Sequence, residues 1–175
     1  MSQIGLVPDA VMPAQIDEAP QPDETPRRLA VRRARAKAQA VASQHGHDYV
    51  LAADTVVALG RRILPKVETE DEGRACLELL SGRAHRVLTA VAVSAPDGRL
   101  SHRLVETRLH FKRLTATEVT GYLASCEGVG KAGGYAIQGR AGAFVVSLEG
   151  SYTAVVGLPL YEAMSLLNGL GYRSG

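Results

Sequence analysis

Residues 49–59 read YVLAADTVVAL, an apolar run interrupted only by Asp54 and Thr55. A valine-rich run of this kind predicts a strand that is buried on both faces of a sheet. A carboxylate midway along such a strand is costly to bury unless it is paired or binds a metal. We therefore favour a functional role for Asp54 over the alternative that it caps a turn at a strand end.

The segments around this run predict an α/β fold. Thr25 before Pro26 marks the start of a basic helix that continues to residue 43. Capping boxes, Thr69-x-x-Glu72 and Thr115-x-x-Glu118, begin two further helices. The other expected elements are strands over 86–95, 99–111, 143–148 and 153–156 and a last helix from 159 to about 169. Hairpin signals together with crossover helices favour a mixed sheet over a purely parallel one.

Two segments predict loops. Residues 7–26 contain five prolines and several acidic residues, which indicates an extended conformation. Residues 128–142 contain six glycines and predict a functional loop or a bulged strand edge, where backbone can approach a ligand closely. Lys131 and Gln138 in this segment are candidate substrate-binding residues. The segment lacks the Gly-Lys-Ser/Thr spacing of a Walker A loop.

Composition excludes several classes of protein. The 175 residues are 46% hydrophobic and 22% charged with a formal net charge of +2, which is ordinary for a globular domain. That charge is too small to indicate binding to nucleic acid or to a membrane surface. No apolar run is long enough to span a bilayer. The first residues show no signal-peptide pattern, so the expected compartment is the cytoplasm.

The cysteines and histidines offer no metal site. Cys76 and Cys126 lie fifty positions apart without a Cys-x-x-Cys motif, which excludes a disulfide framework and gives no zinc signature. We expect both as reduced thiols inside helices. The histidines show no ligand spacing and are all expected at the surface: His45, His47, His85, His102 and His110.

Charged side chains elsewhere suit an anionic ligand. Lys37 on the basic helix and Lys66 in the loop after residue 60 could donate charge-assisted hydrogen bonds to phosphate oxygens. For the other basic residues of the helix we favour a solvated face. The acidic pair Asp17-Glu18 could supply oxygen ligands to a hard cation such as Mg²⁺, although by itself a solvated loop explains it better.

Short motifs along the chain together resemble the Maf family of nucleotide pyrophosphatases, and they occur in the family's order over nearly the whole chain. They are Ile16-Asp17-Glu18, Ala36-Lys37-Ala38, Ala53-Asp54-Thr55-Val56-Val57, Ile63-Leu64-Pro65-Lys66, Leu80-Ser81-Gly82-Arg83, Lys131-Ala132-Gly133-Gly134-Tyr135, Ile137-Gln138-Gly139, Glu149-Gly150-Ser151-Tyr152 and Val156-Gly157-Leu158-Pro159-Leu160. The resemblance implies an α/β fold of the Maf and ITPase-like kind. An elongated mixed β-sheet with flanking helices would form two lobes around a central cleft.

The resemblance also implies an activity and roles for single residues. Residues 1–175 would form one Maf-like domain that uses Mg²⁺ or Mn²⁺ to split a nucleoside triphosphate into the monophosphate and pyrophosphate. A homodimer is possible. Asp54 matches the proton acceptor and, with Glu18, the metal-site carboxylates. The substrate-binding matches are Lys37 and Lys66 for phosphate, and Thr55 and Gln138 as markers of the subgroup acting on dTTP and UTP.

The chain departs from the family pattern in two places. The family's first strand and its Ser-x-Ser-Pro-Arg-Arg loop are expected to be absent, since Met1 falls after that point. The usual Gly-Lys-Pro is Pro65-Lys66-Val67 here. Two alternatives follow from the first departure. The chain could be a nucleotide-binding regulator of cell division or septum formation with weak or no catalysis, or it could be a truncated or mis-started form.

Overall fold

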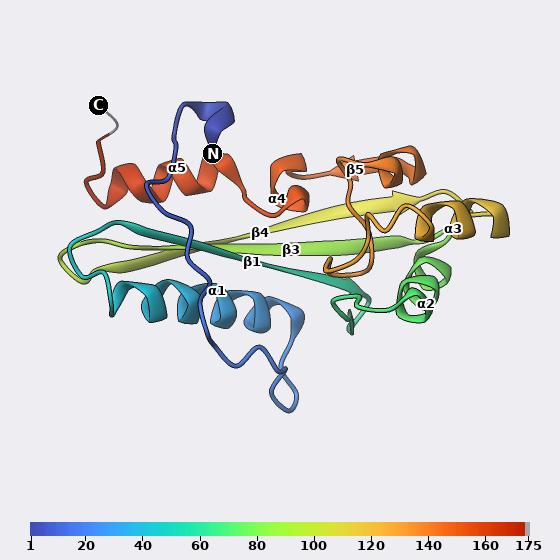
Figure 1. The fold of residues 1–175 in the computed structure, drawn as a ribbon, viewed down its shortest axis with the longest axis horizontal. Coiled ribbons are helices and arrows are strands. Elements are labelled where there is room, and N and C mark those ends of the chain that lie inside the picture. The colour runs from blue at the N-terminus through green and yellow to red at the C-terminus, as the bar shows by residue number, and fades with distance from the viewer. Residues whose placement is uncertain (174–175) are drawn as a thin grey trace.

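A five-stranded sheet forms the centre of the computed structural model, which describes residues 1–173 (Figure 1). The strands are β1 (Val50–Leu59), β2 (Arg62–Leu64), β3 (Ala84–Ser94), β4 (Leu100–Phe111) and β5 (Val145–Glu149). Their order across the sheet is β2-β1-β3-β4-β5. The run quoted above is β1, paired over its whole length with β3.

Every pairing among the described strands is antiparallel, so the prediction of a mixed sheet is wrong, although the α/β class is confirmed. The reason lies in the order of the strands. The helix α2 (Glu70–Leu80) connects β2 to β3 as a crossover, which makes those two strands parallel to each other. They never pair, because β1 lies between them and runs antiparallel to both.

The helices begin where their caps predicted. The side chains of Thr25, Thr69 and Thr115 accept hydrogen bonds at the starts of α1 (Pro26–Ala42), α2 and α3 (Ala116–Leu123), and the last two form complete capping boxes. The final helix is α5 (Leu160–Gly169). The described chain also contains two 3-10 turns, Ser2–Ile4 and Arg140–Phe144.

One predicted strand is a helix. Residues 153–156 belong to α4 (Tyr152–Val156), although threonine and valine favour strands. The hydroxyl of Ser151 accepts a hydrogen bond from the Ala154 backbone N–H and so caps this turn. Gly157, at φ 128°, ends it. The cap and the terminating glycine outweigh the weak strand propensity of four residues.

Two helices cover opposite faces of the sheet (Figure 1). Alternate residues of a strand point to opposite faces. One set of β1 and β3 residues, including Val56 and Leu88, packs on the alanine-rich face of α1. The other set, including Val91 and Val93, packs on α5. The even-numbered residues of β1 therefore face α1, and this parity places Asp54 on the α1 side.

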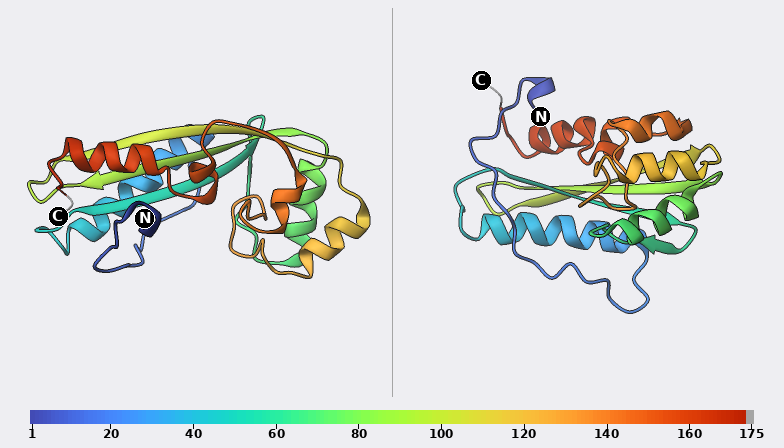
Figure 2. Two further views of the ribbon diagram at one scale, coloured as in Figure 1. Left: turned by 90° about the horizontal axis from the view of Figure 1, so that it is seen from above. Right: turned by 45° about the vertical axis from the view of Figure 1, so that its right-hand side comes forward.

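The molecule is elongated and has two lobes (Figure 2). The sheet with α1 and α5 forms the first lobe. The second lobe, at one end of the sheet, contains α2, α3 and residues 128–142, the glycine-rich segment. The core of the second lobe contains Leu77, Phe111, Tyr122 and Tyr135. Within residues 1–173 no helix is both long and apolar enough to cross a membrane.

Two sequence predictions about single residues are wrong. Cys126 lies outside any helix, at φ 56°, and is exposed, whereas Cys76 is buried in α2 as expected. His85 is only 2% exposed instead of lying at the surface. Its Nε2 lies 2.8 Å from the Tyr135 hydroxyl, and its ring packs edge-on against Phe111. Burial lowers the pKa of His85 from 6.5 to about 4.

Replacing His85 by glutamine is expected to flatten the acid side of the stability profile. Because the pKa of His85 is lower in the folded state, the unfolded chain binds the extra proton between pH 6.5 and about 4. The contribution of neutral His85 is thus complete above pH 6.5 and falls by about 3 kcal/mol as the pH drops through that window. Urea unfolding at several pH values measures the slope, with exposed His47→Gln as control. Equal slopes for wild type and His85→Gln would contradict this expectation.

Candidate active site

A cavity of about 590 Å³ lies beside β1, between α1, the loop after β2 and the glycine-rich segment. All the predicted site residues line it: Glu18, Lys37, Asp54, Thr55, Lys66, Lys131 and Gln138. They come from five separate segments of the chain, so the fold brings together what the sequence spreads over about 120 positions. Their individual roles stay predictions.

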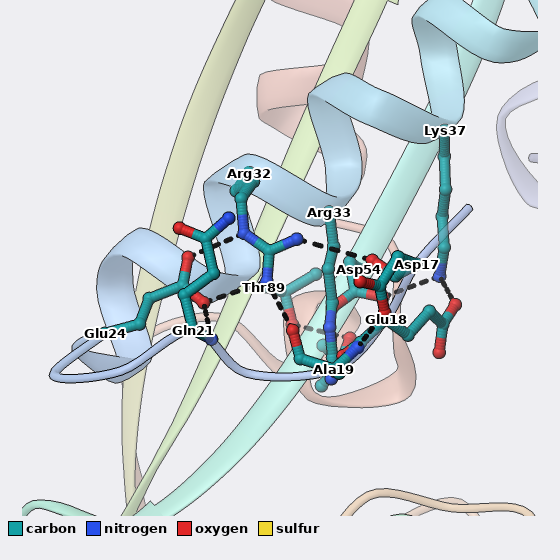
Figure 3. A network of polar contacts seen from close by, with 11 residues as sticks. Asp17, Glu18, Ala19, Gln21, Glu24, Arg32, Arg33, Lys37, Asp54 and Thr89 are labelled. Carbon is teal, nitrogen blue, oxygen red and sulfur yellow. Dashed lines mark hydrogen bonds and ion pairs between the residues drawn. The ribbon is translucent and has the colours of Figure 1, made fainter.

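Asp54 forms the centre of an ion cluster in the lining of this cavity (Figure 3). Its side chain is only 7% exposed. Lys37, which reaches across from α1, donates from Nζ to Asp54 Oδ1 at 2.6 Å. The same Nζ lies 2.7 Å from Glu18 Oε1. The Lys37 ammonium thus holds the Asp54 carboxylate of the sheet close to the Glu18 carboxylate of the loop formed by residues 7–26.

Arg33 belongs to the cluster, and the sequence interpretation missed it. Its NH1 lies 3.6 Å from Asp54 Oδ2, and its guanidinium donates to the backbone carbonyl of Glu18. The expectation of a solvated helix face is therefore wrong for this arginine. The signal was available, because Arg33 and Lys37 are four residues apart and so share one face of a helix.

Burial and neighbouring charges shift the pKa values of Asp54 and Lys37 in opposite directions. Burial raises the pKa of Asp54, and the hydrogen bond and charge of Lys37 only partly offset it. Burial alone would lower the pKa of Lys37, but its bonds to Asp54 and Glu18 outweigh that effect and raise it. The Lys37 hydrogen bond lowers the pKa of Glu18. A protonated Lys37 beside a carboxylate of raised basicity suits proton transfer at Asp54.

The glycine-rich segment positions two further lysines, Lys66 and Lys131, at the cavity. Lys66 pairs with Ala132 in an isolated antiparallel bridge, and the backbone N–H of Val67 donates to the Lys131 carbonyl. Gly133 makes the close approach possible: it sits at φ +70°, and a Cβ there would lie 2.9 Å from a methyl group of Val57. These contacts fix the backbone of Lys66 although a proline precedes it.

Part of the cavity lining is uncharged. Thr55 follows Asp54 in β1 and therefore points to the opposite face of the sheet. Other uncharged lining residues are Val57, Val87, Tyr135, Ala136, Gln138, Val155 and Val156. The lining thus combines charged groups that suit phosphates with uncharged groups that suit a flat, partly apolar group.

Comparison with known proteins agrees with this geometry. Residues 1–170 match the family described as "Maf-like protein". The chain belongs to the Maf family. Three Maf relatives illustrate the similarity, and each is named dTTP/UTP pyrophosphatase. The protein of Caulobacter vibrioides is 61% identical over 99% of this chain and 90% of its own length. The protein of Rhodospirillum rubrum is 59% identical over 100% of this chain and 83% of its own length. The protein of Maricaulis maris is 60% identical over 98% of this chain and 82% of its own length.

The cluster of this Maf chain fits a divalent metal bound together with a substrate. Asp54 Oδ2 is buried and has no hydrogen-bond partner among residues 1–173, and Glu18 lies on the same ammonium. Those residues contain no group of three or more metal-binding side chains. Mg²⁺ is commonly held by one or two carboxylates and by substrate phosphates and waters. Two carboxylates that share the Lys37 ammonium match that requirement.

Proposed function

We propose that this chain hydrolyses dTTP and UTP to the nucleoside monophosphate and pyrophosphate. The observation that carries the proposal is the Asp54–Lys37 pair, which lines a cavity together with Lys66 and Lys131. The three curated relatives quoted above are named for this activity. Removing a water proton beside a fixed polyphosphate needs a carboxylate base and several cations, and the cavity brings these groups together.

The chemical step assigns separate tasks to the residues. A water oxygen adds to one of the two phosphorus atoms of the α–β linkage, and its proton passes to the Asp54 carboxylate. The bond from that phosphorus to the bridging oxygen breaks, and the bridging oxygen leaves with the electron pair, which gives the monophosphate and pyrophosphate. Lys66 and Lys131 bind the phosphate oxygens, and Lys37 with Arg33 orients the carboxylate.

A divalent ion would be held by Asp54 and Glu18, and when bound it would neutralise charge developing on the phosphates. The proposal of a metal is supported by the orphaned Asp54 Oδ2 and by the nearby Glu18 carboxylate. Mg²⁺ and Mn²⁺ both suit oxygen ligands of this kind.

The test is the identity of the products. With dTTP or UTP and Mg²⁺, we expect equal amounts of monophosphate and pyrophosphate, and excess EDTA should abolish their release. Chromatography of the nucleotides and a pyrophosphate-coupled assay measure both products. Release of the nucleoside diphosphate and inorganic phosphate would contradict the proposal. Nucleotide binding in calorimetry without turnover would favour the regulatory alternative. The presence of the Asp54 carboxylate and several cations in one cavity does not favour that alternative.

A further inference from the structure

Thr89 lies directly behind Thr55, outside the set of residues that line the cavity. It belongs to β3 and faces Thr55 in the register of the two strands. Its side chain is fully buried. The Thr89 hydroxyl oxygen lies 2.7 Å from the carbonyl oxygen of Ala154 in α4 and 3.0 Å from the hydroxyl oxygen of Thr55. The two hydroxyls and the carbonyl form a short chain that runs from α4 to the cavity wall.

The direction of this chain follows from the number of protons. A carbonyl can only accept, so the bond to Ala154 uses the one hydroxyl proton of Thr89. Without that proton two oxygens 2.7 Å apart would repel each other. Thr89 can then only accept from Thr55. The proton of Thr55 consequently points away from the cavity, and its oxygen presents lone pairs to a ligand.

The position of Thr55 suggests which part of the substrate meets those lone pairs. Thr55 and Gln138 line the cavity together with the uncharged Tyr135 and Val156. Thr55 points to the face of β1 opposite Asp54, whose cations are Lys37 and Arg33. On the proposed function, on which this inference rests, those cations lie on the side of the phosphates, and we place the nucleobase on the side of Thr55.

We propose that Thr89 is a positioning residue for base selection, because it fixes Thr55 as a hydrogen-bond acceptor. Uracil and thymine carry a ring N–H between two carbonyl groups, and that N–H can donate to such an acceptor. Cytosine has an unprotonated ring nitrogen at the same position, which would set two lone pairs against each other. A site built to accept from a substrate N–H rejects an analogue without it, since a buried polar group is left unpaired.

The experiment compares uracil with cytosine in binding. Dissociation constants are measured by calorimetry for the non-hydrolysable α,β-imido analogues of UTP and CTP, with wild type, Thr89→Val and Thr89→Ser. Wild type is expected to prefer the UTP analogue by about tenfold or more. In Thr89→Val the Thr55 hydroxyl is free to turn and donate, so the preference should fall to about twofold. Thr89→Ser retains the hydroxyl and should restore the wild-type ratio.

The ratio separates this role from a merely structural one. Loss of packing would weaken the binding of both analogues equally and leave the ratio of their dissociation constants unchanged. Valine nearly matches threonine in shape, and the Ala154 carbonyl would retain its bond from the Gly157 N–H. Should Thr89→Val fail to fold, Thr55→Val tests the same idea, because it removes the acceptor and should weaken only the UTP analogue.

Two results would overturn the proposal: a wild type without preference for the UTP analogue, or a Thr89→Val variant that keeps the full preference. Both are read from binding and do not depend on turnover. A wild type that binds the analogues selectively but releases no pyrophosphate from UTP would instead overturn the proposed function alone.

Discussion

Asp54→Asn is expected to lower kcat for UTP hydrolysis by about a thousandfold or more, because the amide cannot accept the proton of the attacking water. Asparagine has nearly the size of aspartate, so the cavity should keep its shape. Lys37 would still be held by Glu18, 2.7 Å away. The loss should therefore appear in kcat much more than in the binding of the nucleotide.

Single-turnover release of pyrophosphate and calorimetric binding of a non-hydrolysable analogue measure the two effects separately. Asp97→Asn is the matched control, since it makes the same chemical change in the exposed turn between β3 and β4. It should leave turnover at the wild-type rate. If Asp54→Asn turned over as fast as wild type, Asp54 would have no part in the reaction.

Lys37→Met is expected to cost about 2 kcal/mol of folding free energy and about a hundredfold in turnover. The substitution leaves the Asp54 carboxylate, only 7% exposed, with Arg33 at 3.6 Å as its remaining cation. Breaking a fully buried pair typically costs about 3–5 kcal/mol. We expect less here, because the Lys37 side chain is 21% exposed and water can reach the site.

A double variant isolates the cause of that loss. In Lys37→Met with Asp54→Asn the buried carboxylate itself is removed, and Arg33 keeps its hydrogen bond to the Glu18 carbonyl. The double variant should therefore be more stable than Lys37→Met alone. Urea unfolding measures all three proteins, with exposed Arg35→Met on the same helix as control. A double variant that is no more stable than Lys37→Met would show that lost packing, and not the orphaned charge, is responsible.

Local sequence predicted most of the elements because their signals are local. Thr69 and Thr115 each cap the helix that follows them, and the hydroxyl and the glutamate of each capping box lie within four residues. The hairpin between β3 and β4 likewise depends on one short turn. Residues 153–156 were misread because strand propensity is weak and a single hydroxyl cap decided the matter.

The candidate site was predicted in part. Asp54 was identified because a carboxylate in an apolar run is costly, and Lys37 because of the family resemblance. Arg33 was missed, although it lies four residues before Lys37 and so shares one face of the helix with it. His85 was misplaced because a lone histidine in a strand gives no sign that a tyrosine fifty residues later will share its hydrogen bond.

The apolar residues 49–59 are enough to predict that β1 is buried and that Asp54 within it needs a partner, because an unpaired charge is costly to bury. The identity of the partners depends on how the helices pack against the sheet. Lys37, Arg33 and Glu18 reach Asp54 because α1 packs on the even-numbered face of β1. The same pleat turns Thr55 away to Thr89 and α4. Adjacent residues of one strand thereby line one cavity from opposite faces of the sheet.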